Sequence, residues 1–216
     1  MPSVTDSSIR TFAHLMERLG GVPLERIRFQ PPPGTATESD VLEVHSREKK
    51  CCELVSGVLV EKAVGYEESI LAIYIASMLG EFVRERNLGH VTGEQGMVRL
   101  FPGLIRIPDV AFASWERFPQ RRLTGEPIPD LVPDLAVEVL SKSNTQAEMK
   151  IKIGEYFSAG VRRVWTIEIP TRTAMDFTSA DQSTTIDEHG RLEADNVLPG
   201  FTLSLTDMFA ELDRHG

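Results

Sequence analysis

The chain has little cysteine and no long hydrophobic run. Its 216 residues include two cysteines, Cys51 and Cys52, which are adjacent. Adjacent cysteines rarely pair with each other, so a disulfide framework and a cysteine-based zinc site are excluded. No apolar run approaches the roughly 18 residues that a membrane-spanning helix needs. The first residues lack the basic flank and apolar stretch of a secretory signal. We therefore expect a cytoplasmic protein that has no membrane association.

Several motifs of other enzyme classes are also missing. The five histidines show no metal-ligand spacing, no serine lies in a nucleophile elbow, and no glycine-rich phosphate loop is present. Positive charge is scarce, with 23 Lys and Arg against 32 Asp and Glu and a net charge of −9. Phosphate binding needs clustered positive charge, so this balance argues against a protein that coats nucleic acid.

The composition is that of an ordinary globular protein, with 41% hydrophobic and 25% charged residues. An amphipathic helix is predicted over residues 7–19, and Gly20 and Gly21 end it. Residues 31–34, Pro-Pro-Pro-Gly, then predict a stiff extended linker. We therefore divide the chain into an N-terminal helical extension with a proline-rich linker, residues 1–36, and a main domain, residues 37–216.

Helical and strand patterns alternate along the main domain. In order, we predict a helix at 37–47, a hairpin at 52–62 turning at Ser56-Gly57, a long helix at 67–86 ended by Gly89, strands at 90–93, 96–100 and 104–113, a polar loop at 115–133, a buried strand at 135–140, a helix at 146–159, strands at 164–169, 173–178 and 183–187, and a terminal segment at 201–212. This order predicts an α/β fold with a mixed β-sheet flanked by helices.

Two carboxylates interrupt sheet-forming sequence. Asp109 follows Pro108, which cannot donate a ladder hydrogen bond, so the strand is unpaired or at an edge there. Glu138 lies in the centre of an apolar run, residues 135–140. A lone carboxylate in such a strand is costly unless it is paired, protonated or bound to a metal. The alternatives are that Asp109 only forms a turn and that Glu138 pairs with a buried arginine or lysine.

Two lysines, Lys150 and Lys152, lie near the start of the helix that follows the Glu138 strand. A Mg²⁺ or Mn²⁺ ion would neutralise Asp109 and Glu138, lower the pKa of a bound water and stabilise the charge that develops in phosphodiester cleavage. A lysine beside them could hold the attacking water and offset the charge of the phosphate. Alternatively, both lysines belong to a solvated helix face.

The start of the long helix offers a further acid. Glu68 lies three, seven and eleven positions before Leu71, Ile75 and Leu79, so it shares their inward stripe. Glu67 lies about 100° around the helix and is the weaker candidate. An alternative role for both is to favour the helix dipole. Glu53, inside the first hairpin strand, could support the site, although we expect it to be exposed.

Five blocks of sequence resemble, in order, a known family. They read CELVSGVLVE at 52–61, LIRIPDVAF at 104–112, PDLAVEVLS at 133–141, KIGEYFSAGV at 152–161 and LPGF at 198–201. Together they resemble the Uma-two-type restriction-endonuclease family of bacteria, within the PD-(D/E)XK nuclease superfamily. The likeness covers roughly residues 37–212 and implies a restriction-endonuclease-like fold with metal-dependent cleavage of DNA.

The resemblance also implies roles for particular residues. Asp109 matches the motif aspartate of the family, and Glu138 matches its (D/E) position. The superfamily lysine normally lies two residues past that acid, where this chain has Leu140. Lys152 matches a helical lysine of the family and would take its place. Glu68 stands where the family often has a histidine, and it resembles the helix glutamate of the wider superfamily.

The sequence therefore predicts a Mg²⁺- or Mn²⁺-dependent phosphodiesterase, a DNA endonuclease. The predicted catalytic residues are Asp109, Glu138, Lys152 and Glu68, and the three acids would bind the metal. One alternative is an inert binding protein that keeps the nuclease fold, which the net acidity and Leu140 favour. Another is a phosphoesterase for a smaller nucleotide, which suits the charge better than bulk DNA. A homodimer is plausible because cutting two strands takes two sites.

Overall fold

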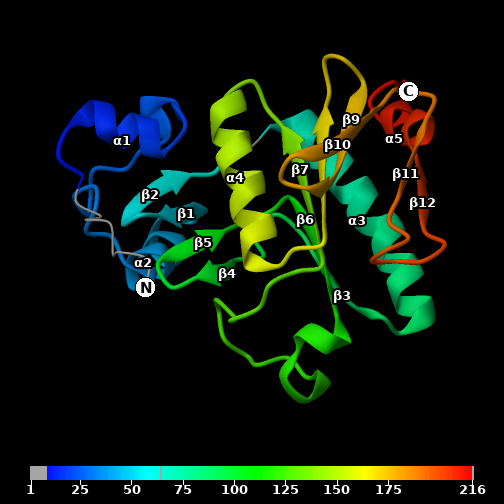
Figure 1. The fold of residues 1–216 in the computed structure, drawn as a ribbon, viewed down its shortest axis with the longest axis horizontal. Helices are drawn as coiled ribbons and strands as arrows, with labels where there is room; N and C mark the ends of the chain where they lie inside the picture. The colour runs from blue at the N-terminus through cyan, green and yellow to red at the C-terminus, as the bar shows by residue number, and fades with distance from the viewer. Residues whose placement is uncertain (1–8, 64, 216) are drawn as a thin grey trace.

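Two β-sheets form the body of the molecule in the computed structural model, which describes residues 9–63 and 65–215 (Figure 1). The six-stranded sheet contains, in spatial order, β10 (Gln182–Ile186), β9 (Thr173–Ser179), β8 (Arg163–Glu168), β7 (Leu135–Leu140), β6 (Val110–Ser114) and β3 (Gly89–Thr92). The four-stranded sheet contains β2 (Val58–Glu61), β1 (Cys52–Val55), β5 (Leu104–Arg106) and β4 (Val98–Phe101). Only β7 and β8 are parallel among the paired strands described, so the larger sheet is mixed, as predicted.

Helices cover both faces of the six-stranded sheet. On one face, α3 (Tyr66–Arg86) packs its buried residues against Leu135, Val137 and Val139 of β7. On the other face, α4 (Gln146–Ala159) packs Ile153 and Tyr156 against Ala136. Successive residues of a strand point to opposite faces, which explains why β7 is apolar on both. The α/β fold with a mixed sheet between helices is confirmed.

The remaining elements of the C-terminal part pack on the α3 side of the sheet. They are β11 (Arg191–Glu193), β12 (Thr202–Ser204) and α5 (Leu205–Ala210). Phe201, just before β12, contacts Phe82 of α3 with its ring edge-on, at 5.3 Å between centroids. Within the described residues, none of the helices combines the length and the hydropathy that crossing a bilayer requires.

The N-terminal segment packs on the hairpin of β1 and β2. Helix α1 (Phe12–Arg18) is followed by the short helix η1 (Leu24–Arg26), and the predicted helix start at residues 7 and 8 lies outside the described residues. Leu15 and Leu19 are buried against hairpin residues such as Val58. Phe12, predicted to face inward, is 49% exposed. The division of the chain at residue 36 stays a prediction.

Local sequence signals place most helix ends correctly. The helix predicted at 37–47 is α2 (Glu38–Glu48), and a capping box of Thr37 and Asp40 opens it. Helix α4 has its predicted bounds and ends at Gly160 in the left-handed conformation. Helix α3 ends at Asn87 rather than at Gly89, because Asn87 itself adopts the left-handed conformation that closes a helix. The polar loop contains two short turns of helix, η2 (Trp115–Arg117) and η3 (Pro119–Arg121).

The strand predicted at 104–113 is in fact two strands in different sheets. It breaks between β5, in the four-stranded sheet, and β6, in the six-stranded sheet. Pro108 lies in the break and lacks the N–H that a continuous ladder would need. Asp109 therefore lies at the seam between the two sheets.

Candidate active site

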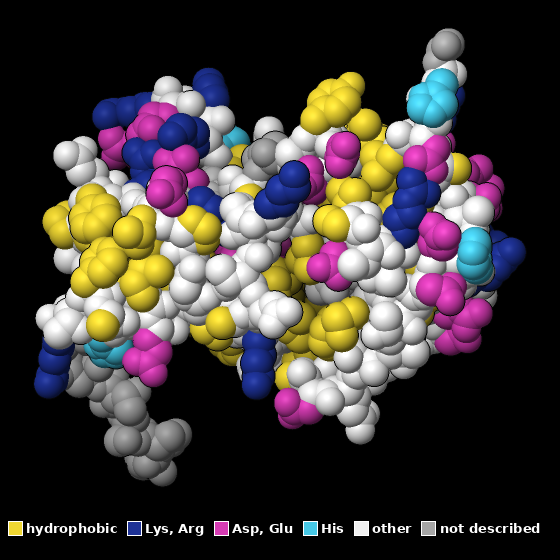
Figure 2. All heavy atoms as spheres, turned by 90° about the horizontal axis from the view of Figure 1, so that it is seen from above, with side chains coloured by type: hydrophobic (Ala, Val, Ile, Leu, Met, Phe, Trp, Pro, Cys, Tyr) yellow, Lys and Arg dark blue, Asp and Glu magenta, His cyan; other side chains and the backbone are white. Residues whose placement is uncertain are grey.

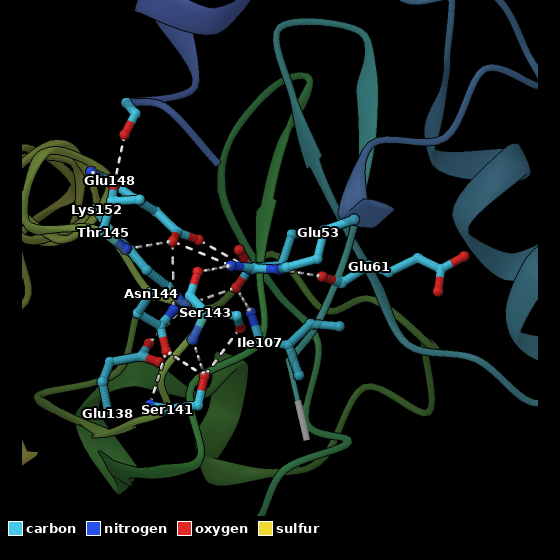
Figure 3. A network of polar contacts seen from close by, with 12 residues as sticks. Glu53, Glu61, Ile107, Glu138, Ser141, Ser143, Asn144, Thr145, Glu148 and Lys152 are labelled. Carbon is cyan, nitrogen blue, oxygen red and sulfur yellow. Dashed lines mark hydrogen bonds and ion pairs between the residues drawn. The ribbon is translucent and has the colours of Figure 1, made fainter. Parts of the chain in front are cut away.

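The carboxylate of Glu138 in β7 contacts Lys152 and Tyr156 of α4. Figure 3 shows Glu138 and Lys152 in the polar network. The Lys152 ammonium lies 2.9 Å from Glu138 Oε1, and the Tyr156 hydroxyl donates to the same oxygen at 2.6 Å. Glu138 and Lys152 are each 4% exposed. Lys152 follows Met149 by three residues and precedes Tyr156 by four, so all three lie on the buried face of the helix.

Glu53 of β1 is the second acid that holds Lys152, at 2.9 Å. Arg106 donates to Glu53 Oε2 at 2.7 Å, and the Ile107 N–H donates to Oε1 at 3.0 Å. Arg106 also pairs with Glu155 at 2.5 Å. The expectation that Glu53 would be exposed is wrong, because every residue of β1 is buried. The four-stranded sheet is covered on both faces there, so alternation does not bring Glu53 to the surface.

Asp109 is anchored to β7 by two backbone hydrogen bonds. Its N–H donates to the Val137 carbonyl at 3.0 Å, and its Oδ2 accepts the Val139 N–H at 2.7 Å. The Lys62 ammonium lies 2.8 Å from Asp109 Oδ1 in a largely buried ion pair. That ammonium is off the direction of a hydrogen bond, and it has no hydrogen-bond partner within the described residues. The ammonium of Lys62 is therefore buried and has N–H groups available to a further acceptor.

Burial and charge act in opposite directions on Glu53 and Lys152. Burial alone would raise the pKa of Glu53, but Lys152, Arg106 and the Ile107 N–H hold it well below its usual range. Burial alone would lower the pKa of Lys152, but Glu138 and Glu53 raise it above its usual value. Both groups therefore stay charged, and each serves as the counter-ion of the other.

Glu138 is the carboxylate whose charge is least well compensated. Burial raises its pKa, Lys152 counteracts the rise, and the nearby charge of Asp109 adds to it. Burial and the charge of Glu138 raise the pKa of Tyr156 well above its usual value, so its hydroxyl keeps its proton and remains a donor. A further cation beside Glu138 and Asp109 would relieve the unfavourable charge.

The residues present fit a hard divalent cation with two protein ligands. Asp109 and Glu138 supply oxygen donors, and Mg²⁺ typically binds one or two carboxylates and keeps several waters. They do not form a cage, because no group of three or more His, Cys, Asp or Glu side chains in the described residues is arranged to hold a metal. A cation at Asp109 would also compete with the ammonium of Lys62.

A cavity of about 550 Å³ opens beside this network, at the carboxyl ends of β7 and β8 and the start of α4. Figure 2 views the molecule from above and shows hydrophobic side chains gathered in a hollow near the middle of this face. Glu68 and Glu67 line the cavity from α3. Glu68 folds back toward Gly65, where a side chain would overlap its carboxylate. Within the described residues, no hydrogen bond or ion pair joins Glu68 to Asp109 or Glu138.

The structure thus brings together Asp109, Glu138 and Lys152, and places Glu68 on the neighbouring cavity wall. Their catalytic and metal-binding roles remain predictions. Sequence reasoning missed three participants, which are Lys62, Arg106 and Tyr156, and it named Glu53 only as an exposed supporting residue. Glu53 carried the same signal as Glu138, an acid within an apolar strand. Lys62 carried none, because it follows a strand at a position where lysine is ordinary.

The family of the chain follows from a comparison with family models. The model of the Uma2 family, described as "Putative restriction endonuclease", matches residues 36–206. The chain belongs to the Uma2 family. The resemblance drawn from the five sequence blocks is therefore confirmed. The Uma2 match begins at residue 36, so the N-terminal helix α1 and the turn η1 lie outside it.

A solved structure supports the same fold. It is titled as a putative nuclease belonging to DUF820 from Anabaena variabilis ATCC 29413, and it matches with a TM-score of 0.68 at 19% identity. The match covers 76% of this chain and 92% of that chain. At this identity the likeness shows the fold alone. No curated protein matches the chain. Membership of the Uma2 family and the fold together support a nuclease.

Proposed function

We propose that the chain is a Mg²⁺- or Mn²⁺-dependent phosphodiesterase that cleaves DNA, with Asp109 and Glu138 as metal ligands of its active site. Two observations on β7 carry the proposal. Asp109 accepts the Val139 N–H of this strand, and its charge adds to the rise in the pKa of Glu138 that burial causes. A metal-dependent nuclease needs a place where a cation can hold a phosphate, and these two acids would provide it. Glu68 is a further proposed ligand, supported by its place on the cavity wall.

The residues of the proposed site would have separate roles in catalysis. When bound, a divalent ion would supply the charge that offsets the phosphate and activates a water. Asp109 is held rigidly by the Val137 and Val139 backbone, so its carboxylate has a fixed direction. Lys152 keeps Glu138 in place and stays charged, while Tyr156 fixes the same carboxylate oxygen. Such preorganisation reduces the cost of reaching the transition state.

Nicking of supercoiled plasmid with Mn²⁺ tests the proposal. We expect the wild-type protein to nick the plasmid, and Asp109→Asn and Glu138→Gln to lose the activity by at least about a hundredfold. Glu193→Gln is the matched control, because Glu193 of β11 is exposed, does not line the cavity and has no hydrogen bond or ion pair with the carboxylate network in the described residues. A wild-type protein without nicking activity, or variants that nick equally well, would contradict the proposal.

A second candidate function is a binding protein that has the nuclease fold and no chemistry. The ion pairs of Lys62 with Asp109 and of Lys152 with Glu138 favour it, since both carboxylates already have a cation. Leu140 at the superfamily lysine position favours it too. Calorimetry separates the candidates. A nuclease should bind Mn²⁺ with a heat that Glu138→Gln removes, whereas an inert binding protein should show no such heat.

The setting of the activity is also part of the proposal. The scarcity of cysteine supports a cytoplasmic protein, and membership of the Uma2 family supports action on DNA. A homodimer would supply the two sites that cutting both strands of a duplex requires, and a monomer would cut one strand at a time. Light scattering after size exclusion separates these two forms.

A further inference from the structure

One wall of the cavity beside the carboxylate network carries the hydroxyl of Thr166, which has no protein partner within the described residues. The volume of about 550 Å³ lies within the range of small-molecule sites, roughly 300–1,000 Å³. Thr166 of β8 lines the cavity and is 4% exposed, and its hydroxyl has no hydrogen-bond partner within the described residues. The buried side-chain atoms without a partner in the described residues belong to Arg28 and Lys62, so the Thr166 hydroxyl is reached from the cavity and is available to a molecule there.

The walls combine an apolar floor with polar edges. Leu140, Met149 and Ile153 contribute apolar surface, and Phe177 adds an aromatic ring. The side chains of Ser141 and Gln146 lie at the edges. A nucleobase has the matching chemistry, because its two faces are apolar and its rim carries hydrogen-bond donors and acceptors.

The cavity adjoins Glu138 through the register of the sheet. Thr166 is the strand partner of Glu138, and parallel neighbours in register point to the same face. Leu140 continues β7 two positions beyond Glu138, also on that face. A nucleotide whose base enters the cavity would therefore hold its phosphate close to the carboxylate network.

The charges around the cavity suit one strand of nucleic acid better than two. Lys142 and Lys150 line it together with Glu67, Glu68 and Glu168, and neither lysine has an ion-pair partner in the described part of the chain. Two lysines can hold the phosphates that flank one nucleotide. A duplex carries two charged backbones and gains most from an extended basic surface, which a chain of net charge −9 does not favour.

We propose that this cavity binds the base and sugar of one nucleotide of a single-stranded nucleic acid, with the Thr166 hydroxyl contacting the ligand. The inference rests on the proposed function, because it names the substrate class of the same site. Single strands are recognised by unstacked bases in apolar or aromatic pockets, and this cavity provides such a pocket next to the carboxylates.

Binding measured without cleavage tests the inference. A fluorescein-labelled single-stranded oligonucleotide and the duplex formed with its complement are titrated with protein in EDTA, and anisotropy is recorded. We expect the single strand to bind more tightly than the duplex. Thr166→Val, which removes only the hydroxyl, should weaken single-strand binding about fivefold. Ala180→Trp, in the turn after β9, should fill the cavity and weaken single-strand binding at least about tenfold. Thr178→Trp, in β9 two residues earlier but outside the cavity, should not weaken it.

Two results would overturn the inference. One is duplex binding that equals or exceeds single-strand binding, and the other is unchanged affinity in both Thr166→Val and Ala180→Trp. Thermal unfolding of each variant shows whether a loss of affinity comes from loss of the fold. The test is separate from that of the proposed function. Plasmid nicking with unchanged affinities would defeat only the inference, and single-strand binding through the cavity without nicking would defeat only the nuclease.

Discussion

Glu53 and Glu138 share the ammonium of Lys152 but differ in what else surrounds them. Glu53 also has Arg106 and a backbone N–H, whereas Glu138 also has the charge of Asp109 nearby. Removing one partner from a buried charge pair leaves the other uncompensated, which costs more than an exposed pair does. The same substitution at the two positions should therefore have different results.

We predict that Glu53→Gln lowers the free energy of unfolding by about 3 kcal/mol at neutral pH, because Arg106 and Lys152 each lose a buried partner. Glu138→Gln should leave the free energy unchanged or raise it. The raised pKa of Glu138 means that the fold disfavours its charged form, and an amide keeps an acceptor for Tyr156. Urea unfolding followed by circular dichroism measures both. Equal destabilisation by the two variants would refute this account.

Lys62 is the residue that competes with a divalent ion for Asp109. We predict that Lys62→Met increases the affinity for Mn²⁺ by about tenfold or more, because the variant removes a positive charge 2.8 Å from a ligand oxygen. Calorimetric titration with Mn²⁺ gives the affinity without reference to cleavage. Lys50→Met is the matched control, since Lys50 pairs with Glu61 and is far more exposed. Unchanged or weaker binding in Lys62→Met would show that the lysine does not oppose the ion.

The residues that sequence reasoning found and missed differ in one physical respect. Asp109 and Glu138 were found because each breaks a pattern within its own segment. Lys62 and Arg106 were missed because their significance depends on partners more than 40 positions away in the chain. Local periodicity carries no information about which distant charge a side chain will meet.

At the scale of elements, α4 is held at its start by the N-terminal segment. Arg26 of η1 donates to the carbonyl of Glu61 at 2.9 Å and to the carbonyl of Ser143 at 3.3 Å, and it pairs with Glu148 at 2.9 Å. Figure 3 shows Glu148 and the loop residues Ser143 and Thr145 in this network. The Thr145 hydroxyl donates to the carbonyl of Gly20 at 2.5 Å. The extension thus fixes the loop between the Glu138 strand and the Lys152 helix.

We predict that Arg26→Gln speeds amide hydrogen exchange over residues 141–148 by at least about tenfold, because three segments lose a shared donor. Arg28→Gln is the matched control. Arg28 also joins the extension to the core, through Glu48 and Glu61. Within the described residues, it has no hydrogen bond or ion pair with α4. Exchange measured by mass spectrometry distinguishes the two. If both variants speed exchange in the loop equally, Arg26 has no special role there.

Elements with a strong local pattern were predicted closely, including α4 with its bounds and β7. The single strand predicted at 104–113 was wrong, because Pro108 allows the chain to leave one sheet and join another. A continuous strand and a strand that changes sheets share the same alternation of residues. Only the strands on either side decide between them, and these come from distant parts of the sequence.

At the scale of the whole molecule, paired carboxylates link stability to pH. The pKa values of Glu38, Asp40, Glu53, Glu61 and Asp213 are all lowered, each with a cation or hydrogen-bond donor beside it. A carboxylate with a lowered pKa stabilises the fold when the pH is above its unfolded-state pKa. That contribution is lost as the pH falls through its folded-state pKa. Glu138, with its raised pKa, acts in the opposite direction.

We predict that the free energy of unfolding falls steadily as the pH is lowered from about 5 to about 3. The reason is that the unfolded chain takes up more protons than the folded chain in this window. Urea midpoints measured across the window give the slope. Glu53→Gln should reduce the slope, because it removes a buried carboxyl whose pKa is 4.5 in the unfolded chain and lower in the fold. A slope that stays the same in this variant would show that Glu53 does not contribute to the acid sensitivity.

The passage of residues 107–109 from one sheet to the other has a consequence for how the chain can vary in length. Ile107 is bonded to Glu53 in the smaller sheet, and Asp109 is bonded to Val137 and Val139 in the larger one. Only Pro108 separates these anchors. An inserted or deleted amino acid here would pull Asp109 off its backbone anchors, whereas residues 119–127 of the loop are exposed and can accept such changes. Deletions and duplications introduced along the gene should therefore be tolerated in the loop and eliminated at the seam.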